Sequence, residues 1–330
     1  MFKILTLNNI AVEGLRHLPR ERYEVASEIA HPDAILLRSY KMHDMDIPDT
    51  VAAVGRAGAG TNNIPVDAMT ARGVPVFNAP GANANAVKEL AIAGMLMGAR
   101  NLCNARDYVK SLTETGDALN KAVEAGKKQF VGFELPGKTL GIIGLGAIGV
   151  EVANAALDLG MKVVGFDPAI TVKNAWQLSS GVEQEETLDQ LFMHADYVTV
   201  HVPLLDATRN LVNESRIQLM KDGGVLINFA RGGVVDDAAA LAALDSGKLH
   251  AFITDFPTPE LIAHPKVVAL PHLGASTGEA EANCAIMVAE NVKDYLENGN
   301  VRFSVNFPKA ILSRLDAWRI TVANANVPNM

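Results

Sequence analysis

The chain has 330 residues, with 29 Lys or Arg and 37 Asp or Glu, so its formal net charge is −8. Hydrophobic residues make up 49% of it and charged residues 20%, which is typical of a globular protein, and the length predicts two domains. The negative charge and the lack of a basic run argue against nucleic acid as a partner. No apolar stretch predicts a membrane span or a signal peptide. The two cysteines, Cys103 and Cys284, form neither a disulfide framework nor a zinc-site spacing, so we expect no metal and a reducing, cytoplasmic location.

Short aliphatic runs in the first third of the chain alternate with segments of helical periodicity, which predicts βα units and a parallel sheet. The predicted strands are Ile4–Leu7, Ala34–Leu37, Val51–Gly55 and Val74–Phe77. The predicted helices are Ala11–Leu18, Val66–Arg72 and a long one over Ala84–Lys110. The next segment, Ser111–Phe133, is polar and without a firm period, which indicates an exposed loop or an arm that reaches another subunit.

A second βα series begins at Thr139, and its strands are apolar on both faces, as in sheets covered by helices on both sides. The predicted strands are Thr139–Ile143, Lys162–Phe166, Tyr197–Val202, Val225–Phe229, Ala251–Thr254 and Val267–Leu270. The predicted helices are Ala147–Leu159, Leu188–His194, Glu214–Met220, Asp237–Ser246 and Glu279–Asn298. The fold class predicted is therefore α/β, with two doubly wound parallel-sheet domains of Rossmann or flavodoxin type.

A glycine-rich turn with the sequence GLGAIG lies between a predicted strand and a predicted helix at residues 144–149. In a dinucleotide fingerprint, Gly144 would permit the tight turn, Gly146 the approach of a pyrophosphate and Gly149 close packing of helix and strand. The backbone N–H groups of Ala147 and Ile148 would face the phosphates. The alternative is a purely structural glycine turn.

An acidic residue, Asp167, ends the strand that follows this turn and lies close to the spacing expected for a ribose-binding carboxylate. Such a carboxylate accepts hydrogen bonds from the adenosine ribose and repels a 2′-phosphate. No arginine follows it closely, so the sequence favours NAD over NADP.

Five long segments give the chain a resemblance to the D-isomer-specific 2-hydroxyacid dehydrogenases over nearly its whole length. They are GKTLGIIGLGAIG (137–149), HVPLLDATRNLV (201–212), INFARGGVVDD (227–237), TDFPTPE (254–260) and PHLGAST (271–277). Segments 55–69 and 80–90 are most similar to the family members that oxidise 3-phospho-D-glycerate to 3-phosphohydroxypyruvate with NAD, the first step of serine biosynthesis. The alternatives are another 2-hydroxy acid (glyoxylate, hydroxypyruvate or D-lactate as the family's other substrates) or an NAD(H)-sensing protein without catalysis.

The resemblance implies a catalytic triad of Arg231, Glu260 and His272. His272 would exchange a proton with the substrate hydroxyl, while Glu260 would orient and stabilise its imidazole. Arg231 would bind the carboxylate or polarise the carbonyl oxygen of the substrate. The segment around Glu260 departs from the family motif, but Glu260 is the only acid between Asp255 and His272.

The resemblance also implies further contacts to the cofactor and the substrate. The additional NAD-binding residues would be Val202, Ala230, Asp255, Gly274 and Ala275. The substrate cleft would be lined by Arg38, Arg56, Gly58 and Asn83. For Arg38 and Arg56 the alternative is that they pair with surface acids.

The same resemblance predicts an NAD domain inserted into a substrate domain. The expected boundaries are 1–100 with 283–310 for the substrate domain and 101–282 for the NAD domain, which would close around the substrate. Residues 311–330 resemble the start of a truncated ACT regulatory domain. We expect a homodimer or a higher homo-oligomer, with 111–133 embracing the second subunit.

Overall fold

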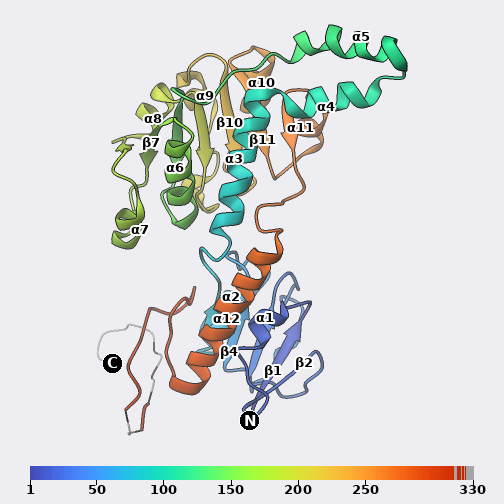
Figure 1. Ribbon diagram of the computed structural model, residues 1–330. Coiled ribbons are helices and arrows are strands. Elements are labelled where there is room, and N and C mark those ends of the chain that lie inside the picture. The colour runs from blue at the N-terminus through green and yellow to red at the C-terminus, as the bar shows by residue number, and fades with distance from the viewer. Residues whose placement is uncertain (316–317, 321, 323, 325–330) are drawn as a thin grey trace. The chain divides into compact units, whose positions relative to one another are not determined.

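The computed structural model describes residues 1–315, 318–320, 322 and 324, and it forms two compact units (Figure 1). Unit 1 comprises Met1–Asn83 and Ser276–Met330, and unit 2 comprises Ala84–Ala275. Each unit contains one sheet in which every paired strand is parallel. This confirms the predicted α/β fold class and its two parallel sheets.

Unit 1 is built on a sheet of five strands in the order β2-β1-β3-β4-β5. The strands are β1 (Phe2–Leu7), β2 (Tyr23–Ala26), β3 (Ala34–Leu37), β4 (Ala53–Arg56) and β5 (Val76–Phe77). Its helices are α1 (Val12–Leu15), α2 (Val66–Ala71) and α12 (Gly278–Asn298). The strand β2 is absent from the sequence-based prediction because it is short and its charged residue, Glu24, interrupts the apolar pattern.

Close helix packing explains two glycines of unit 1. A Cβ on Gly55 would lie 2.7 Å from Val288 Cγ2, so this glycine lets α12 pack directly on β4. A Cβ on Gly14 would lie 2.6 Å from Ala285 Cβ, so α1 and α12 also approach closely. The long helix α12 is therefore anchored on the sheet and on α1 through small residues.

Unit 2 is built on a sheet of seven strands in the order β12-β11-β10-β9-β6-β7-β8. The strands are β6 (Thr139–Ile143), β7 (Lys162–Phe166), β8 (Val182–Gln184), β9 (Tyr197–Val200), β10 (Gly224–Asn228), β11 (Leu249–Thr254) and β12 (Val267–Ala269). The helices that pack around it are α3 (Ala84–Arg100), α6 (Ala147–Asp158), α7 (Val172–Gln177), α8 (Leu188–His194), α9 (Glu214–Leu219), α10 (Asp237–Asp245) and α11 (Pro259–Ala263), with a short 3₁₀ turn η2 (Asp206–Thr208). Apolar side chains of each central strand alternate between two cores: Val225 and Ile227 join α3 and α6, while Leu226 joins α8, α9 and α10.

The helix α3 belongs to unit 2, although the expected boundary at residues 100 and 101 assigned it to the substrate domain. A Cβ on Gly94 would lie 3.0 Å from Phe229 Cε2, and one on Gly98 would lie 3.1 Å from Val225 Cγ1. The two glycines let α3 pack on β10, which is why the contact boundary lies at Asn83 and Ala84. At the other boundary, unit 2 ends at Ala275 and unit 1 resumes at Ser276, whereas the sequence predicted this boundary between residues 282 and 283.

The long helix predicted over 84–110 is interrupted at Asn101, whose φ of 52° places it in the left-handed region. A second helix, α4 (Leu102–Ser111), starts directly after it. The following segment was expected to lack regular structure but forms α5 (Gly116–Gly126) and a 3₁₀ turn, η1 (Lys127–Phe130). In Figure 1 the α4–α5 arm extends away from the sheet of unit 2.

The end of the chain makes a few local contacts. Arg319 Nη1 donates to Asn298 O at 2.6 Å and to Asn300 Oδ1 at 2.8 Å. Of residues 319–330, which belong to the tail that resembles the start of an ACT domain, only 319, 320, 322 and 324 are described, so that expectation lies outside the described residues. Within the described part of the chain, no helix is long and apolar enough to cross a membrane.

Candidate active site

The expected site residues of unit 2 follow the carboxyl ends of its parallel strands, which lie along one edge of the sheet. The sequence connections reverse direction between β6 and β9, two neighbouring strands. In open α/β sheets ligands bind in the crevice that such a reversal creates at the carboxyl edge. The glycine turn follows β6, and Arg231, Asp255 and His272 follow β10, β11 and β12.

The three glycines of the turn have different environments. Gly144 has a φ of 94°, and a Cβ there would lie 2.8 Å from His201 O. A Cβ on Gly149 would lie 2.0 Å from Gly144 O, so helix α6 packs on the turn without space for a side chain. Gly146 has open space on that side, and as the N-cap of α6 it offers no side-chain cap to the free N–H groups of Ala147 and Ile148. This open cradle at a helix N-terminus fits a pyrophosphate.

Asp167 is joined to the glycine turn by a hydrogen bond. Its Oδ2 accepts from Leu145 N at 2.8 Å, and its Oδ1 accepts from Ala169 N at 2.9 Å. The carboxylate is only partly buried. It is therefore held at the end of β7 beside the turn, where the sequence analysis placed a ribose acceptor.

The backbone around Arg231 is fixed by a buried asparagine. Asn228, only 2% exposed, donates from Nδ2 to Arg231 O at 2.9 Å and accepts from Ala230 N at 3.1 Å. The Arg231 side chain is exposed, and its Nη1 donates to Ala230 O. Asn228 was not among the predicted site residues; a polar residue that ends a buried strand was the available signal.

Asp255 joins the loop after β11 to the loop after β12. Its side chain is 1% exposed, and Oδ2 accepts from Gly274 N at 3.0 Å. Its other oxygen, Oδ1, is buried and has no hydrogen-bond partner among the described residues. A buried acceptor of this kind is costly unless a ligand satisfies it. Asp255 Oδ1 therefore fits an amide N–H₂ group such as that of nicotinamide.

His272 lies in the loop that Asp255 holds. Its φ of 53° is left-handed, which is uncommon outside glycine, and its ring packs against that of Phe256 with centroids 4.9 Å apart. A Cβ on Gly232 would lie 3.5 Å from Phe256 Cβ, so Phe256 also borders the loop that carries Arg231. Phe256, which sequence reasoning missed, thus contacts the loops of two of the three predicted catalytic residues, Arg231 and His272.

Glu260 occupies the first turn of α11, which Thr258 caps. Its carboxylate is exposed and makes no hydrogen bond to His272 in the described part of the chain. Burial, Asp236 and Glu260 together raise the pKa of Asp237. Catalytic hydrogen bonds commonly tighten only when substrate is bound, so the role of Glu260 stays a prediction.

His201 directly follows β9, and its imidazole is enclosed beside the glycine turn although the residue as a whole is partly exposed. Its Nε2 lies 3.0 Å from Thr199 Oγ1, whereas its Nδ1 is buried without a partner among the residues described. Burial lowers the pKa of His201 to about 4, so the imidazole is neutral at physiological pH. Two further predicted NAD-binding residues also lie at this edge of the sheet. Val202 follows the end of β9, and Ala230 follows the end of β10.

This buried histidine makes the stability of the protein depend on pH. The pKa of His201 is lowered from 6.5 to about 4 on folding, so the unfolded chain takes up a proton at higher pH than the folded one. Its contribution is present above about pH 6.5 and is lost as pH falls toward 4. At about pH 5 the loss is about 2 kcal/mol. We expect urea unfolding of His201→Gln to lose about 2 kcal/mol less than wild type between about pH 7.5 and 5; equal losses would contradict this.

Unit 1 contains the residues predicted for the substrate. Arg38 Nη1 pairs with Glu281 Oε1 at 2.8 Å, so this arginine does have the acidic partner considered as the alternative. Arg56 Nε donates to Arg38 O at 3.1 Å. A Cβ on Gly58 would lie 2.4 Å from Arg56 Nη1, so the glycine makes room for that guanidinium. Arg38, Arg56 and Gly58 therefore lie together. Asn83 is the last residue of this part of unit 1, and its Oδ1 is buried without a partner in the described chain.

Comparison with known proteins agrees with this geometry. Residues 92–274 match the NAD binding domain of the D-isomer specific 2-hydroxyacid dehydrogenases, a match that covers more than half of the chain. The chain belongs to the D-isomer specific 2-hydroxyacid dehydrogenase family. Unit 2, which contains the matched residues, is thus its NAD-binding domain, and the resemblance stated from the motifs is confirmed.

Several curated relatives of the chain are D-3-phosphoglycerate dehydrogenases. The chain is 37% identical over 314 residues to the D-3-phosphoglycerate dehydrogenase of Archaeoglobus fulgidus, and 36% identical over 326 residues to that of Bacillus subtilis. These alignments cover 91% and 93% of this chain but 56% and 59% of the relatives. The chain therefore spans a little more than half the length of the curated relatives it matches.

Solved structures match this chain over nearly their whole length. The holo form of Rhodotorula graminis D-mandelate dehydrogenase is 26% identical, with a TM-score of 0.79 and coverage of 93% of this chain and 99% of that one. The NAD⁺-bound 3-phosphoglycerate dehydrogenase of Entamoeba histolytica is also 26% identical, with a TM-score of 0.70 and coverage of 93% and 99%. The open side of Gly146 and the unpartnered Oδ1 of Asp255 fit the NAD that this domain binds.

Proposed function

We propose that the protein oxidises 3-phospho-D-glycerate to 3-phosphohydroxypyruvate with NAD, and catalyses the reverse reaction, as the first step of serine biosynthesis. The observation that carries the proposal is the meeting of the Arg231, Asp255 and His272 loops at the carboxyl edge of the NAD-binding sheet. The name shared by the curated relatives supports the choice of substrate.

The proposed chemistry assigns one task to each side chain. Bound NAD supplies a hydride acceptor. The imidazole of His272 takes the proton of the C2 hydroxyl, and in the reverse direction returns it to the carbonyl oxygen. Arg231 offers a planar pair of N–H donors to the substrate carboxylate, and Glu260 stabilises the protonated imidazole. Asp255 holds the loop of His272 through Gly274 N.

A phosphorylated acid has a second anionic end, which requires further cations. Arg38 and Arg56 of unit 1 are the proposed ligands of the phosphate, with Gly58 and Asn83 as further substrate contacts. The guanidinium of Arg38 is 37% exposed and still has N–H donors besides the one that Glu281 receives. An arginine held by a carboxylate is pre-oriented for a phosphate.

A substrate panel tests this assignment and separates it from the nearest alternative. We expect Arg38→Ala to raise KM for phosphohydroxypyruvate by about 10- to 100-fold, because the phosphate loses one or two charge-assisted hydrogen bonds. KM for hydroxypyruvate or glyoxylate should change little. Glu281→Gln is the matched control, since it removes the ion pair and keeps the arginine. Equal losses on all acids would favour the alternative, a reductase of an unphosphorylated acid.

The preference for NAD is tested at Asp167. Asp167→Asn keeps an acceptor for Leu145 N but loses the charge that repels a 2′-phosphate. We expect the ratio of NADH to NADPH affinity, measured by fluorescence titration, to fall by about tenfold. An unchanged ratio would remove Asp167 from cofactor selection.

The proposal extends to assembly and location. Leu102 and Val109 on the α4–α5 arm are 49% and 51% exposed, which supports a homodimer or higher homo-oligomer in which the arm contacts a second subunit. The two cysteines are free, which is consistent with a reducing cytoplasm.

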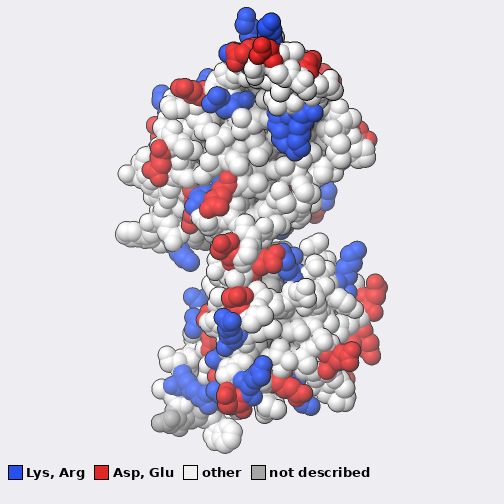
Figure 2. Space-filling model, turned by 45° about the vertical axis from the view of Figure 1, so that its right-hand side comes forward, with Lys and Arg blue, Asp and Glu red and all other residues white. Residues whose placement is uncertain are grey.

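On the face shown in Figure 2, acidic and basic side chains are interspersed without a continuous basic patch, so nothing there favours nucleic acid. NADH binding without turnover of any 2-keto acid would instead favour a sensing protein.

A further inference from the structure

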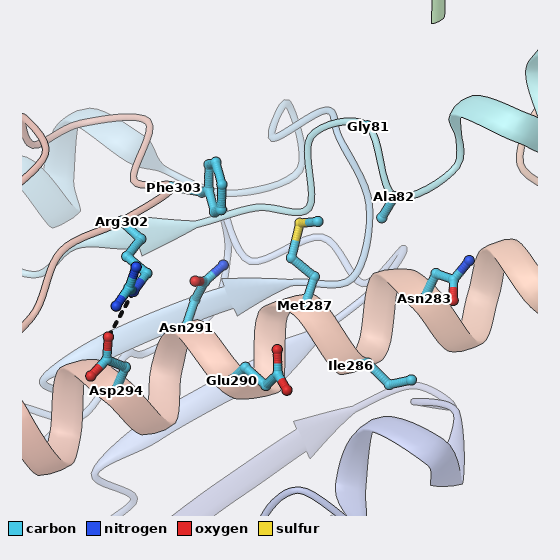
Figure 3. A pocket seen from close by; sticks show the side chains of 10 residues that line it. All are labelled: Gly81, Ala82, Asn283, Ile286, Met287, Glu290, Asn291, Asp294, Arg302 and Phe303. Atoms are coloured by element: carbon cyan, nitrogen blue, oxygen red, sulfur yellow. Dashed lines mark hydrogen bonds and ion pairs between the residues drawn. The ribbon is translucent and has the colours of Figure 1, made fainter. Parts of the chain in front are cut away.

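A cavity of about 670 Å³ lies in unit 1, along one side of α12. None of its lining residues is among those proposed for catalysis or substrate binding, although Gly81 and Ala82 directly precede Asn83. Its opposite wall is formed by two loops, one around Gly81 and one around Phe303 (Figure 3). The volume is within the range of small-molecule sites in proteins.

One wall carries a buried side chain without a hydrogen bond. Asn291 is 4% exposed and lines the cavity, and its Nδ2 has no partner among the residues that the structure describes. In Figure 3 its amide rises from α12 toward the loop that carries Phe303. Buried donors in folded proteins are nearly always paired, so this amide lacks an acceptor.

A second donor, Arg302, comes from the loop of Phe303 and is held against Asp294 of α12. Arg302 Nε donates to Asp294 Oδ2 at 2.8 Å, and Asp294 Oδ1 accepts from Asn298 and Asn300 at 2.9 Å each. Burial alone would raise the pKa of Asp294, but these hydrogen bonds outweigh it and lower that pKa below its ordinary value. The Arg302 side chain is 46% exposed, and its Nη atoms have no acceptor among the described residues, so oriented cationic donors remain free.

The acids of the cavity are already engaged. Asp294 is neutralised by Arg302, and Glu290 Oε1 lies 3.1 Å from His17 Nδ1. The remaining walls include the thioether of Met287 and the ring of Phe303, which is 44% exposed. The hydrogen-bonding groups of the cavity that remain unused are therefore donors, and they lie beside an apolar surface.

We propose that this cavity binds a small organic carboxylate, whose oxygens accept hydrogen bonds from Arg302 and Asn291 and whose apolar body packs on Met287 and Phe303. The guanidinium and the amide supply the charge-assisted and neutral donors that a carboxylate requires. A simple fatty acid and an apolar amino acid share this chemistry, and they differ by the ammonium group of the amino acid.

Titration of the full chain with isovalerate and with leucine tests the site. The readouts are calorimetry and the methyl resonance of Met287 in protein labelled at methionine methyl groups, assigned with Met287→Leu. We expect one of the two probes to bind and to shift this resonance, and the stronger one identifies the source of the carboxylate. Arg302→Met and Asn291→Leu should each weaken binding by about tenfold or more, whereas isobutylamine should not bind.

Two control variants distinguish this cavity from other anion sites. Arg16→Met removes an exposed cation of unit 1 that does not line the cavity, and Arg231→Met removes the cation of the candidate active site. Both should bind the probe as wild type does. Binding that survives Arg302→Met but disappears in Arg231→Met would overturn the proposal, as would the absence of binding by both probes. If Asn291→Leu does not fold, Arg302→Met decides alone, because its side chain is half exposed.

Discussion

Replacement of His272 is expected to abolish turnover of phosphohydroxypyruvate while leaving NADH binding intact. General acid–base catalysis by a positioned side chain contributes about 10²- to 10⁴-fold, so kcat of His272→Asn should fall by at least about 10²-fold. The measurement is NADH oxidation under saturating substrate, with NADH affinity from fluorescence titration.

The choice of asparagine matters because His272 has a left-handed φ of 53°. Asparagine tolerates this conformation better than alanine, so His272→Asn removes the imidazole and preserves the loop. His272→Gly, which adopts the conformation without strain, should unfold at equal or higher urea concentration than wild type and be equally inactive. A variant with wild-type kcat would exclude His272 from the proton transfer.

Replacement of Asp255 is expected to affect both stability and cofactor binding, through different oxygens. Its Oδ2 accepts from Gly274 N, so Asp255→Ala leaves that buried N–H without an acceptor and should cost about 1–3 kcal/mol in urea unfolding. Loss of the hydrogen bond also frees the loop of His272, and a displacement of about 1 Å in a catalytic group can lower kcat by about 10²-fold.

Asp255→Asn separates the two roles. The amide oxygen can still accept from Gly274 N, whereas its N–H₂ group replaces the unpartnered Oδ1. If Oδ1 accepts from the nicotinamide amide, this variant keeps its stability and binds NADH at least about tenfold more weakly. Wild-type NADH affinity in Asp255→Asn would show that Oδ1 does not contact the cofactor.

Local motifs were predictable from the sequence because their chemistry is encoded in adjacent residues. The turn at 144–149 has its expected strand, helix and glycine packing, and Asp167 lies beside it. The central strands β6 and β7 were predicted with the bounds observed, since their runs are apolar and buried. The short edge strand β8 was missed because Glu183 and Gln184 are exposed and leave no apolar pattern.

Features that join distant residues were not predictable in the same way. The ion pair of Arg38 with Glu281 and the contact of Phe256 with His272 depend on how the chain folds back on itself. The break at Asn101 was hidden because the apolar periodicity continues on both sides of it. The unpartnered amide of Asn291 is also visible only in the folded unit, since asparagine in a helix is usually exposed.

Assay of the purified full chain with NADH against a panel of 2-keto acids tests the account most directly. The panel contains phosphohydroxypyruvate, hydroxypyruvate, glyoxylate and pyruvate. We expect NADH oxidation with the highest kcat/KM on phosphohydroxypyruvate, and its loss in His272→Asn. A protein that binds NADH but oxidises it with none of the four acids would contradict the assignment of Arg231 and His272 to catalysis.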